Sequence, residues 1–160
     1  MVTAAAVWAA LEDVKDPEIP PVSVVDMGMV TIVSVDEGEV RIEMTPTFVG
    51  CPALDIIRRD VTRRVEQVDG VKAVEVAFVF DPPWTSERIT DQGRQRLKTW
   101  GIAPPMREKA GNLISLDEVP PCPYCGSRDT HMENLFGPTA CRSIYYCDGC
   151  RQPFEGIKTV

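Results

Sequence analysis

The fold of the first part of this 160-residue chain is decided by one stretch, Leu54-Asp-Ile-Ile-Arg-Arg-Asp-Val-Thr-Arg-Arg-Val-Glu-Gln-Val68. Its apolar residues are spaced three or four positions apart, which is the spacing of one face of an α-helix. Arginine and acidic residues occupy most of the other positions. Asp69-Gly70 follows directly and is typical of a helix end. The pattern therefore predicts an amphipathic helix over 54–68 with one face against a sheet.

Strand patterns stand on both sides of this helix. The alternating stretches 30–35 and 40–44 surround the turn Asp36-Glu-Gly38, which together predict a β-hairpin. The apolar stretch 74–80 predicts a third strand, and Asp81-Pro-Pro83 ends it because proline lacks a backbone N–H.

Two further helices are expected outside this group. The first has Val7, Leu11 and Val14 on one face and ends at Asp16-Pro17, because the residue before a proline avoids the α region. The second covers 90–100 and ends at Gly101. The element order α-β-β-α-β plus a short helix predicts a small α+β sandwich, in which helices cover a sheet.

Composition and charge limit the classes of function. The chain is 44% hydrophobic and 26% charged, which is ordinary for a globular protein. Residues 1–90 carry 8 basic and 16 acidic side chains, and an acidic surface argues against nonspecific nucleic-acid binding. The longest apolar run, at 4–11, is much shorter than the ~20 residues of a membrane-spanning helix. No basic residue precedes Lys15, as a secretory signal would require, so we expect a cytoplasmic protein.

Paired prolines divide the chain. Five of the six cysteines follow the last pair, Pro120-Pro121, and Pro104-Pro105 marks an earlier break. We therefore expect a domain at 1–100, a proline-rich linker at 101–120 and a small cysteine-rich module at 121–160.

The module contains two CxxC pairs, Cys122-Pro-Tyr-Cys125 and Cys147-Asp-Gly-Cys150, with 21 residues between them. Two such knuckles, brought together by a hairpin, form a tetrahedral four-sulfur site, so the spacing predicts a zinc-ribbon-like module. A segment of about 40 residues also needs such a staple because its apolar core is small. Zinc is the first choice of metal, and iron or an iron–sulfur cluster is the alternative.

Two other side chains of the module leave alternatives open. Cys141 is either a small buried hydrophobe or an extra ligand or redox thiol. His131 is the only histidine, and we expect a polar loop position for it because four cysteines already fill a tetrahedron. A single histidine excludes a multi-histidine metal site in this chain. There is also no glycine-rich phosphate-binding loop, so neither NAD nor ATP is indicated.

The segment between the hairpin and the long helix holds the remaining cysteine. Pro52 suits a first helical position, which puts Cys51 at or near the N-cap, where the positive helix end favours a thiolate. Gly50 would allow close backbone approach, and Thr45 and Thr47 supply hydroxyls. Cys51 is therefore a candidate reactive or cofactor-holding thiol, and a structural helix-capping cysteine is the alternative.

Asp16 and Glu18 bracket a proline after the first helix. One interpretation is turn chemistry with a solvated acid. The other is a pair of carboxylates near Cys51 that holds a metal or tunes the thiol.

Several motifs now carry a family resemblance. Asp-Pro-Glu-Ile-Pro (16–20), Ser-Val-Val-Asp-Met-Gly-Met-Val (23–30) and Thr-Pro-Thr-Phe-Val-Gly-Cys-Pro (45–52) resemble the iron–sulfur assembly domain family that includes SufT. The cysteine module adds Phe136-Gly-Pro-Thr-Ala-Cys141 and Pro153-Phe154. With it, nearly the whole chain resembles the PaaD family, which is encoded with the phenylacetyl-CoA epoxidase of aerobic phenylacetate breakdown.

The resemblance implies a function. Members with the iron–sulfur assembly domain help to assemble or insert iron–sulfur or iron cofactors in other proteins, and the family's cysteine, acidic pair and threonines correspond to Cys51, Asp16 with Glu18, and Thr45 with Thr47. It thus implies an accessory maturation protein, without catalytic activity of its own, for a multicomponent monooxygenase. The implied partners are epoxidase subunits or iron–sulfur assembly proteins, and a second copy of the chain is also considered.

Two other functions remain open at this point. The chain could be a structural or electron-transfer subunit of the epoxidase, or a regulator that binds proteins through a zinc ribbon.

Overall fold

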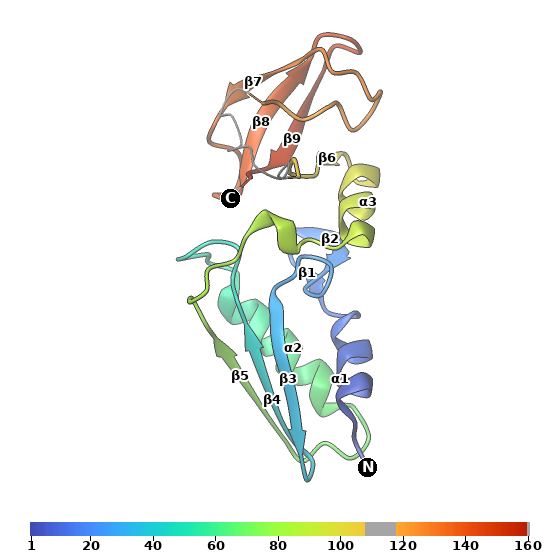
Figure 1. Cartoon of the computed structure of the whole chain (residues 1–160), viewed down its shortest axis with the longest axis vertical. Coiled ribbons are helices and arrows are strands. Elements are labelled where there is room, and N and C mark those ends of the chain that lie inside the picture. The colour runs from blue at the N-terminus through green and yellow to red at the C-terminus, as the bar shows by residue number, and fades with distance from the viewer. Residues whose placement is uncertain (108–117, 160) are drawn as a thin grey trace. The chain divides into compact units, whose positions relative to one another are not determined.

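The computed structural model describes residues 1–107 and 118–159, and these form two compact units (Figure 1). The first comprises Met1–Trp84 with Arg88–Gly93, and the second comprises Thr85–Glu87 with Arg94–Val160. Residues 101–107, which the sequence assigns to a linker, thus belong to the second unit. Residues 108–117 of that linker lie outside the described residues.

The first unit is built on a three-stranded sheet of order β3-β4-β5. β4 is antiparallel to β3 and parallel to β5, so helix α2 makes the crossover from β4 to β5. Figure 1 shows helices α1 and α2 on the same side of this sheet. The elements are α1 (Ala4–Leu11), β3 (Val30–Asp36), β4 (Glu39–Met44), α2 (Leu54–Glu66) and β5 (Ala73–Phe78). The predicted hairpin, third strand and covering helices are therefore present, and the α+β class is confirmed. The first helix ends at Leu11 and not at Asp16-Pro17 as predicted, because Lys15–Asp16 form strand β1.

The core of this unit lies between the sheet and the two helices. Alternate residues of β4, Val40, Ile42 and Met44, are at most 2% exposed, as strand periodicity requires. The helices contribute further side chains with no more than 3% exposure, which are Val7, Ala10, Leu11, Ile57, Val61 and Val65. The apolar stripe of residues 54–68 therefore faces the core at its centre, and only its two ends, Leu54 and Val68, are half-buried.

A small two-stranded sheet was not expected from the sequence. β1 (Lys15–Asp16) pairs antiparallel with β2 (Ile19–Ser23), so Pro20 and Pro21 lie inside a strand rather than at a boundary. Proline is tolerated there because a two-stranded sheet consists of edge strands, which do not need every N–H for pairing.

A buried turn ties Trp84 and the segment 88–93 to the rest of the first unit. The backbone N–H of Ser23 donates to Asp26 Oδ2 (3.1 Å), and the Asp26 N–H donates to Ser23 Oγ (3.0 Å). The Asp26 carbonyl accepts from the Thr90 N–H (2.9 Å), and Trp84 Nε1 donates to the Met27 carbonyl (2.7 Å). This turn therefore has a structural role.

The second unit contains a four-stranded sheet of order β6-β9-β8-β7, in which β6 is parallel to β9 and the other pairs are antiparallel. One small core cluster of this unit consists of Ala103, Cys122, Tyr145, Cys147 and Phe154. Leu97, Ile102 and Ile157 are also buried. The elements are β6 (Ile102–Ala103), β7 (Thr130–Asn134), β8 (Arg142–Cys147) and β9 (Gln152–Ile157).

Two further elements occupy the region where the units divide, η1 (Ser86–Arg88) and α3 (Asp91–Thr99). As predicted, α3 ends before Gly101, whose φ of 88° is a left-handed conformation that glycine adopts freely.

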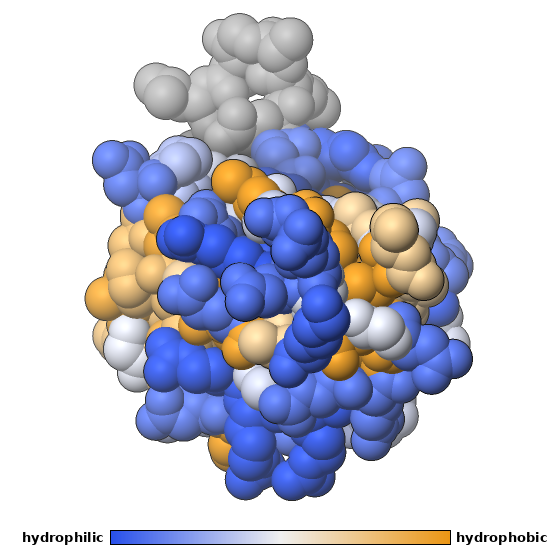
Figure 2. All heavy atoms as spheres, turned by 90° about the horizontal axis from the view of Figure 1, so that it is seen from below, coloured by the Kyte–Doolittle hydropathy of each residue, from blue (hydrophilic) through white to orange (hydrophobic). Residues whose placement is uncertain are grey.

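Hydrophilic side chains predominate on the face shown in Figure 2, with scattered apolar residues between them. In the part of the chain that the structure describes, no helix is both long and apolar enough to cross a membrane.

Candidate functional site

The four cysteines of the CxxC pairs come from two loops of the second unit. Cys122 and Cys125 lie in the loop that precedes β7, whereas Cys147 is the last residue of β8 and Cys150 lies in the turn between β8 and β9. The first loop is closed by the Gly126 N–H, which donates to the Cys122 carbonyl (2.9 Å), with Gly126 at a φ of 76°. The two loops are joined by the Asp148 N–H, which donates to the Asp129 carbonyl (2.9 Å).

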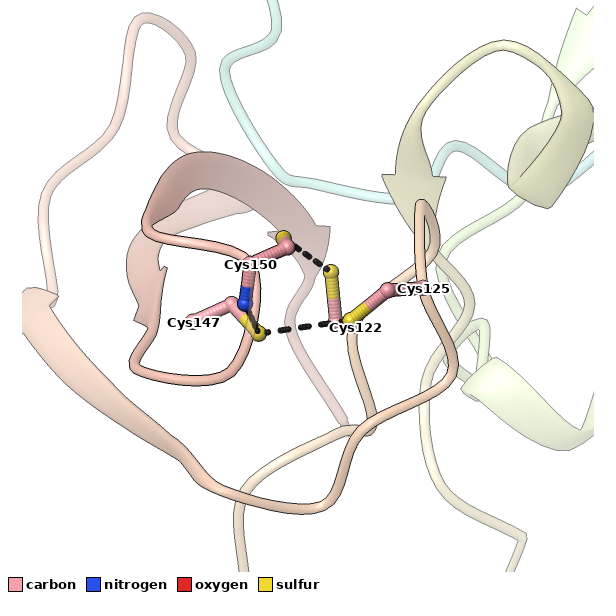
Figure 3. A group of neighbouring side chains, drawn as sticks. All are labelled: Cys122, Cys125, Cys147 and Cys150. Carbon is pink, nitrogen blue, oxygen red and sulfur yellow. Dashed lines mark hydrogen bonds between the residues drawn. The ribbon is translucent and has the colours of Figure 1, made fainter.

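These loops bring the four sulfur atoms to one point (Figure 3). All four Sγ atoms lie within 4.8 Å of one another, with Cys122 and Cys150 3.7 Å apart and Cys125 and Cys147 3.6 Å apart. Zinc–sulfur bonds of about 2.3 Å in a tetrahedron separate neighbouring sulfurs by about 3.8 Å. The arrangement therefore fits a single metal ion held by four thiolates.

The protein environment already favours a thiolate at one of these positions. The Cys150 backbone N–H donates to Cys147 Sγ (3.4 Å), and this bond is the main reason that the pKa of Cys147 falls to about 7. Desolvation instead raises the pKa of Cys150 to about 12. A bound cation would overcome that cost, because a coordinating thiol is deprotonated outright.

The second loop is narrow at Gly149. A Cβ atom there would lie 2.8 Å from Ser127 Oγ and 3.5 Å from Cys147 Sγ. A side chain at this position would force the Ser127 side chain to shift, so glycine favours the close approach of the two loops.

His131 contacts carboxylates rather than the cysteines. Its Nδ1 lies 2.9 Å from Asp148 Oδ2 and its Nε2 lies 2.8 Å from Glu133 Oε1. These two hydrogen bonds, with Asp148 the stronger cause, raise the pKa of His131 above its usual value. His131 therefore bridges β7 and the second cysteine loop. The sequence predicts a polar loop position for His131. The histidine instead lies in strand β7, and its two hydrogen-bond partners were not predicted.

Cys141 is not part of the four-cysteine cluster, which is the group of possible metal ligands found among the described residues. It is half-buried at the start of β8, and its Sγ lies 3.2 Å from Thr139 Oγ1. Its backbone carbonyl accepts from the Lys158 N–H (2.9 Å). This environment is that of a packed side chain beside a strand end.

In the first unit, Cys51 lies in the connection between β4 and α2. The N-cap of α2 is Ala53, two residues later, and the Cys51 carbonyl accepts from the Leu54 N–H (3.3 Å). Cys51 thus sits just before the helix, near the predicted N-cap position but not in it. Its side chain is half-buried, and none of the six cysteines forms a disulfide.

The residues before Cys51 form an exposed tip. Phe48 is 47% and Val49 is 74% exposed, and the Cys51 N–H donates to the Phe48 carbonyl (3.4 Å) to close the turn. Gly50 has a φ of 83°, and a Cβ atom there would meet nothing within 4 Å. Glycine is therefore needed for its left-handed conformation and not for the close backbone approach that the sequence suggested.

The threonines of this connection differ in exposure. Thr45 is 2% exposed and its N–H donates to the Met29 carbonyl (2.7 Å), which fixes the end of β4. Thr47 is half-buried and closer to the exposed tip.

Asp16 forms a local turn, because its Oδ1 accepts from the Glu18 N–H (2.8 Å). Asp16 is half-buried and Glu18 is exposed. Turn chemistry is thus present at these carboxylates, and their role toward Cys51 stays a prediction.

Comparison with known protein families separates the chain into two parts, much as the structure separates it into two units. Residues 4–78 match the family described as iron–sulfur cluster assembly protein, and residues 107–158 match the PaaD zinc beta ribbon domain. A Bacillus subtilis protein named Fe-S protein maturation auxiliary factor YitW is 40% identical over 85 residues, which are 52% of this chain and 82% of that protein.

Solved structures resemble the first part of the chain. A Bacillus anthracis domain of unknown function, DUF59, has a TM-score of 0.56 at 35% identity and covers 59% of this chain and 90% of its own. A conserved hypothetical protein from Thermotoga maritima has a TM-score of 0.53 at 36% identity and covers 60% of this chain and 94% of its own.

One relative spans both parts. An Escherichia coli protein that is named as a subunit of 1,2-phenylacetyl-CoA epoxidase is 39% identical over 158 residues, which are 96% of this chain and 92% of that protein. The first unit is thus similar to iron–sulfur assembly proteins, the second carries the four-cysteine ribbon, and the chain belongs to the PaaD family of phenylacetyl-CoA epoxidase proteins.

Proposed function

We propose that this chain is an accessory protein that helps to mature the phenylacetyl-CoA epoxidase by assembling or inserting an iron or iron–sulfur cofactor. In this proposal the first unit handles the cofactor and the second unit is a zinc-stabilised module that binds the client. Its partners are epoxidase subunits or proteins of iron–sulfur assembly.

The observation that carries the proposal is the setting of Cys51. Its thiol lies in a connection beside an exposed apolar tip formed by Phe48 and Val49. Relatives of this unit carry the name Fe-S protein maturation auxiliary factor. A thiol next to exposed apolar side chains can meet a client protein and its metal at the same surface.

Cys51 would act as a metal ligand in its thiolate form. One thiolate is too few for a stable site, so the other positions need further donors. Asp16 and Glu18 are the proposed carboxylate donors of this chain, Thr45 and Thr47 are proposed to shape the connection, and the client supplies the rest. An incomplete ligand set suits transfer, because the metal can leave when the client offers a complete set.

The four cysteines of the second unit are proposed to hold one zinc ion permanently. The sulfur separations of 3.6 and 3.7 Å support a single ion, and zinc is favoured over iron as a structural metal with four thiolates. Metal analysis and a visible spectrum of protein purified without oxygen test this. One zinc without colour is expected, and iron with charge-transfer bands would contradict it.

The maturation role is tested with Cys51→Ala in cells that produce the epoxidase. The variant is expected to fold, to keep its zinc and to leave the epoxidase without full cofactor content or activity. Cys141→Ala is the matched control, because it removes a half-buried thiol outside both proposed sites, and normal epoxidase is expected with it.

A second measurement separates maturation from a subunit role, which the name of the Escherichia coli relative favours. Purified epoxidase that already contains its cofactors is assayed with and without this chain. Equal rates are expected. If every turnover requires the chain, it is a structural or electron-transfer subunit and the maturation proposal is wrong.

A further inference from the structure

The second unit contains a cavity beside the first cysteine loop that no motif of the sequence indicates. It has a volume of about 340 Å³, and the end of α3, the segment 104–107 and the loop 121–128 line it. This volume lies at the lower end of the range for small-molecule sites, about 300–1,000 Å³.

The charged side chains that line the cavity, among the residues that the structure describes, all have one sign. They are Arg94, Lys98, Arg107 and Arg128, and no described lining residue is acidic. Lys98 and Arg128 are exposed, and within the described residues no ion pair joins either of them to a carboxylate. The exposed cations Lys98 and Arg128 therefore give this concave surface a positive potential that attracts multiply charged anions.

Arg94 differs from the others because it also holds the cavity in shape. Its guanidinium donates to the Pro105 carbonyl (2.5 Å) and to the Ser86 carbonyl (3.1 Å). The charge of Arg94 is thus fixed at the cavity wall, whereas Lys98 and Arg128 reach it from exposed positions on separate segments.

The uncharged walls indicate what kind of anion fits. They include Pro104, Pro105, Pro121, Pro123 and Met106. The four prolines have no backbone N–H, so they offer phosphate no main-chain donor of the kind that a glycine-rich loop provides. The cationic side chains are therefore the main polar contacts, and the proline rings offer rigid apolar surface for an organic group.

We propose that this cavity binds the phosphate groups of a small organic phosphate, with Lys98 and Arg128 as the main contacts and the proline walls against the organic part. The proposal is independent of the maturation role, because it uses no residue of the first unit. It holds whether the neighbouring cysteines bind zinc or iron.

The cationic side chains of the cavity have a second possible role, which is to balance the negative charge of the neighbouring metal site, and the test must distinguish it from phosphate binding. Four thiolates around a divalent ion carry a net charge of −2, and Cys122 itself lines the cavity. If the cations serve only to balance that charge, their removal weakens metal retention and the cavity binds no anion.

The test uses the full chain with its metal, and ADP as the probe, in calorimetric titrations at low salt. We expect one ADP per chain and no binding of adenosine. Lys98→Glu and Arg128→Glu should each weaken ADP binding about tenfold or more, because each loses a charge-assisted contact to phosphate. Binding should also weaken as salt is added.

Arg63→Glu is the matched control. It makes the same change in net charge on an exposed arginine of α2 in the first unit, and it should change the ADP affinity by less than about twofold. Metal content is measured before and after every titration. The proposal is overturned if ADP does not bind, if adenosine binds as well as ADP, if the control variant loses as much affinity, or if the Lys98 and Arg128 variants lose metal.

Discussion

The two units of this protein are stabilised in different ways. The first contains a sheet covered by two helices, with fully buried aliphatic side chains such as Leu11, Ile42 and Val61. In the second unit, the core cluster next to the metal site contains Ala103, Tyr145 and Phe154 together with two cysteines of that site, Cys122 and Cys147. Burial of apolar surface is therefore expected to be sufficient for the first unit, whereas the second is expected to depend on a metal.

This difference also separates two uses of cysteine. In the second unit, four thiols face one another and form a complete ligand set. In the first unit, Cys51 is one half-buried thiol beside an exposed tip. A complete set suits permanent binding and an incomplete one suits exchange, which is why we place cofactor handling in the first unit.

Removal of the metal should have the largest effect on stability, and it should separate the two units most clearly. Cys147→Ser, or a strong chelator, is expected to unfold the second unit, because metal binding contributes about 10 kcal/mol or more in small four-ligand domains. Backbone NMR signals of the first unit should remain dispersed. Cys141→Ser is the control and should retain the metal. The comparison fails if Cys147→Ser keeps its full metal content, or if both units unfold together.

A substitution that leaves a void in the core of the first unit should destabilise that unit and leave the second unit unchanged. Leu11 is 0% exposed, so Leu11→Ala is expected to destabilise the first unit by about 2–5 kcal/mol. Urea unfolding measures this, followed by tryptophan fluorescence in a Trp100→Phe background so that Trp8 and the buried Trp84 of the first unit give the signal. The metal content of the second unit should not change, and a loss of metal would show that the units are not independent.

Cys51→Ala should have a much smaller effect on folding. The thiol is half-buried and Ala53, not Cys51, is the helix N-cap, so we expect a loss of no more than about 1 kcal/mol. The same urea titration measures it. A loss of several kcal/mol would mean that Cys51 is a core residue, and any effect on the epoxidase would then need no cofactor role.

The smallest effect is expected at His131, and it should depend on pH. The hydrogen bonds to Asp148 and Glu133 raise the pKa of this histidine in the folded state. Its contribution to stability is therefore fully present below the unfolded pKa of about 6.5 and is lost as pH rises through the folded pKa. Thermal unfolding of His131→Gln should differ more from wild type at pH 6 than at pH 9. An equal difference at both pH values would contradict the assignment.

Periodic patterns and cysteine spacing were sufficient to predict much of this molecule. The helix expected over 54–68 runs from Leu54 to Glu66, and the two CxxC pairs meet as their spacing indicates. The helix follows from apolar residues that recur at the spacing of one helix face. The metal site follows from the short, fixed spacing of the cysteines within each pair.

The remaining features depend on contacts that no local pattern encodes. Strand β6 has only two residues, too few to show periodicity, and it forms by pairing with β9, about 50 residues later. The cavity proposed to bind phosphate combines Lys98, Arg107 and Arg128 from three segments. Each of these residues alone resembles an ordinary surface cation, and only the folded chain shows that they share one surface.

The division of the chain also has a consequence for biosynthesis. Every residue of the first unit, through Gly93, precedes Cys122 in the sequence. During translation the first unit can therefore fold before any of the four clustered cysteines of the second unit has been made, since domains fold as they emerge. The second unit must wait for Cys150 and for an available metal ion. When metal is scarce, the cell would hold chains with a folded first unit and an unfolded second one, and such chains are expected to be substrates for proteases.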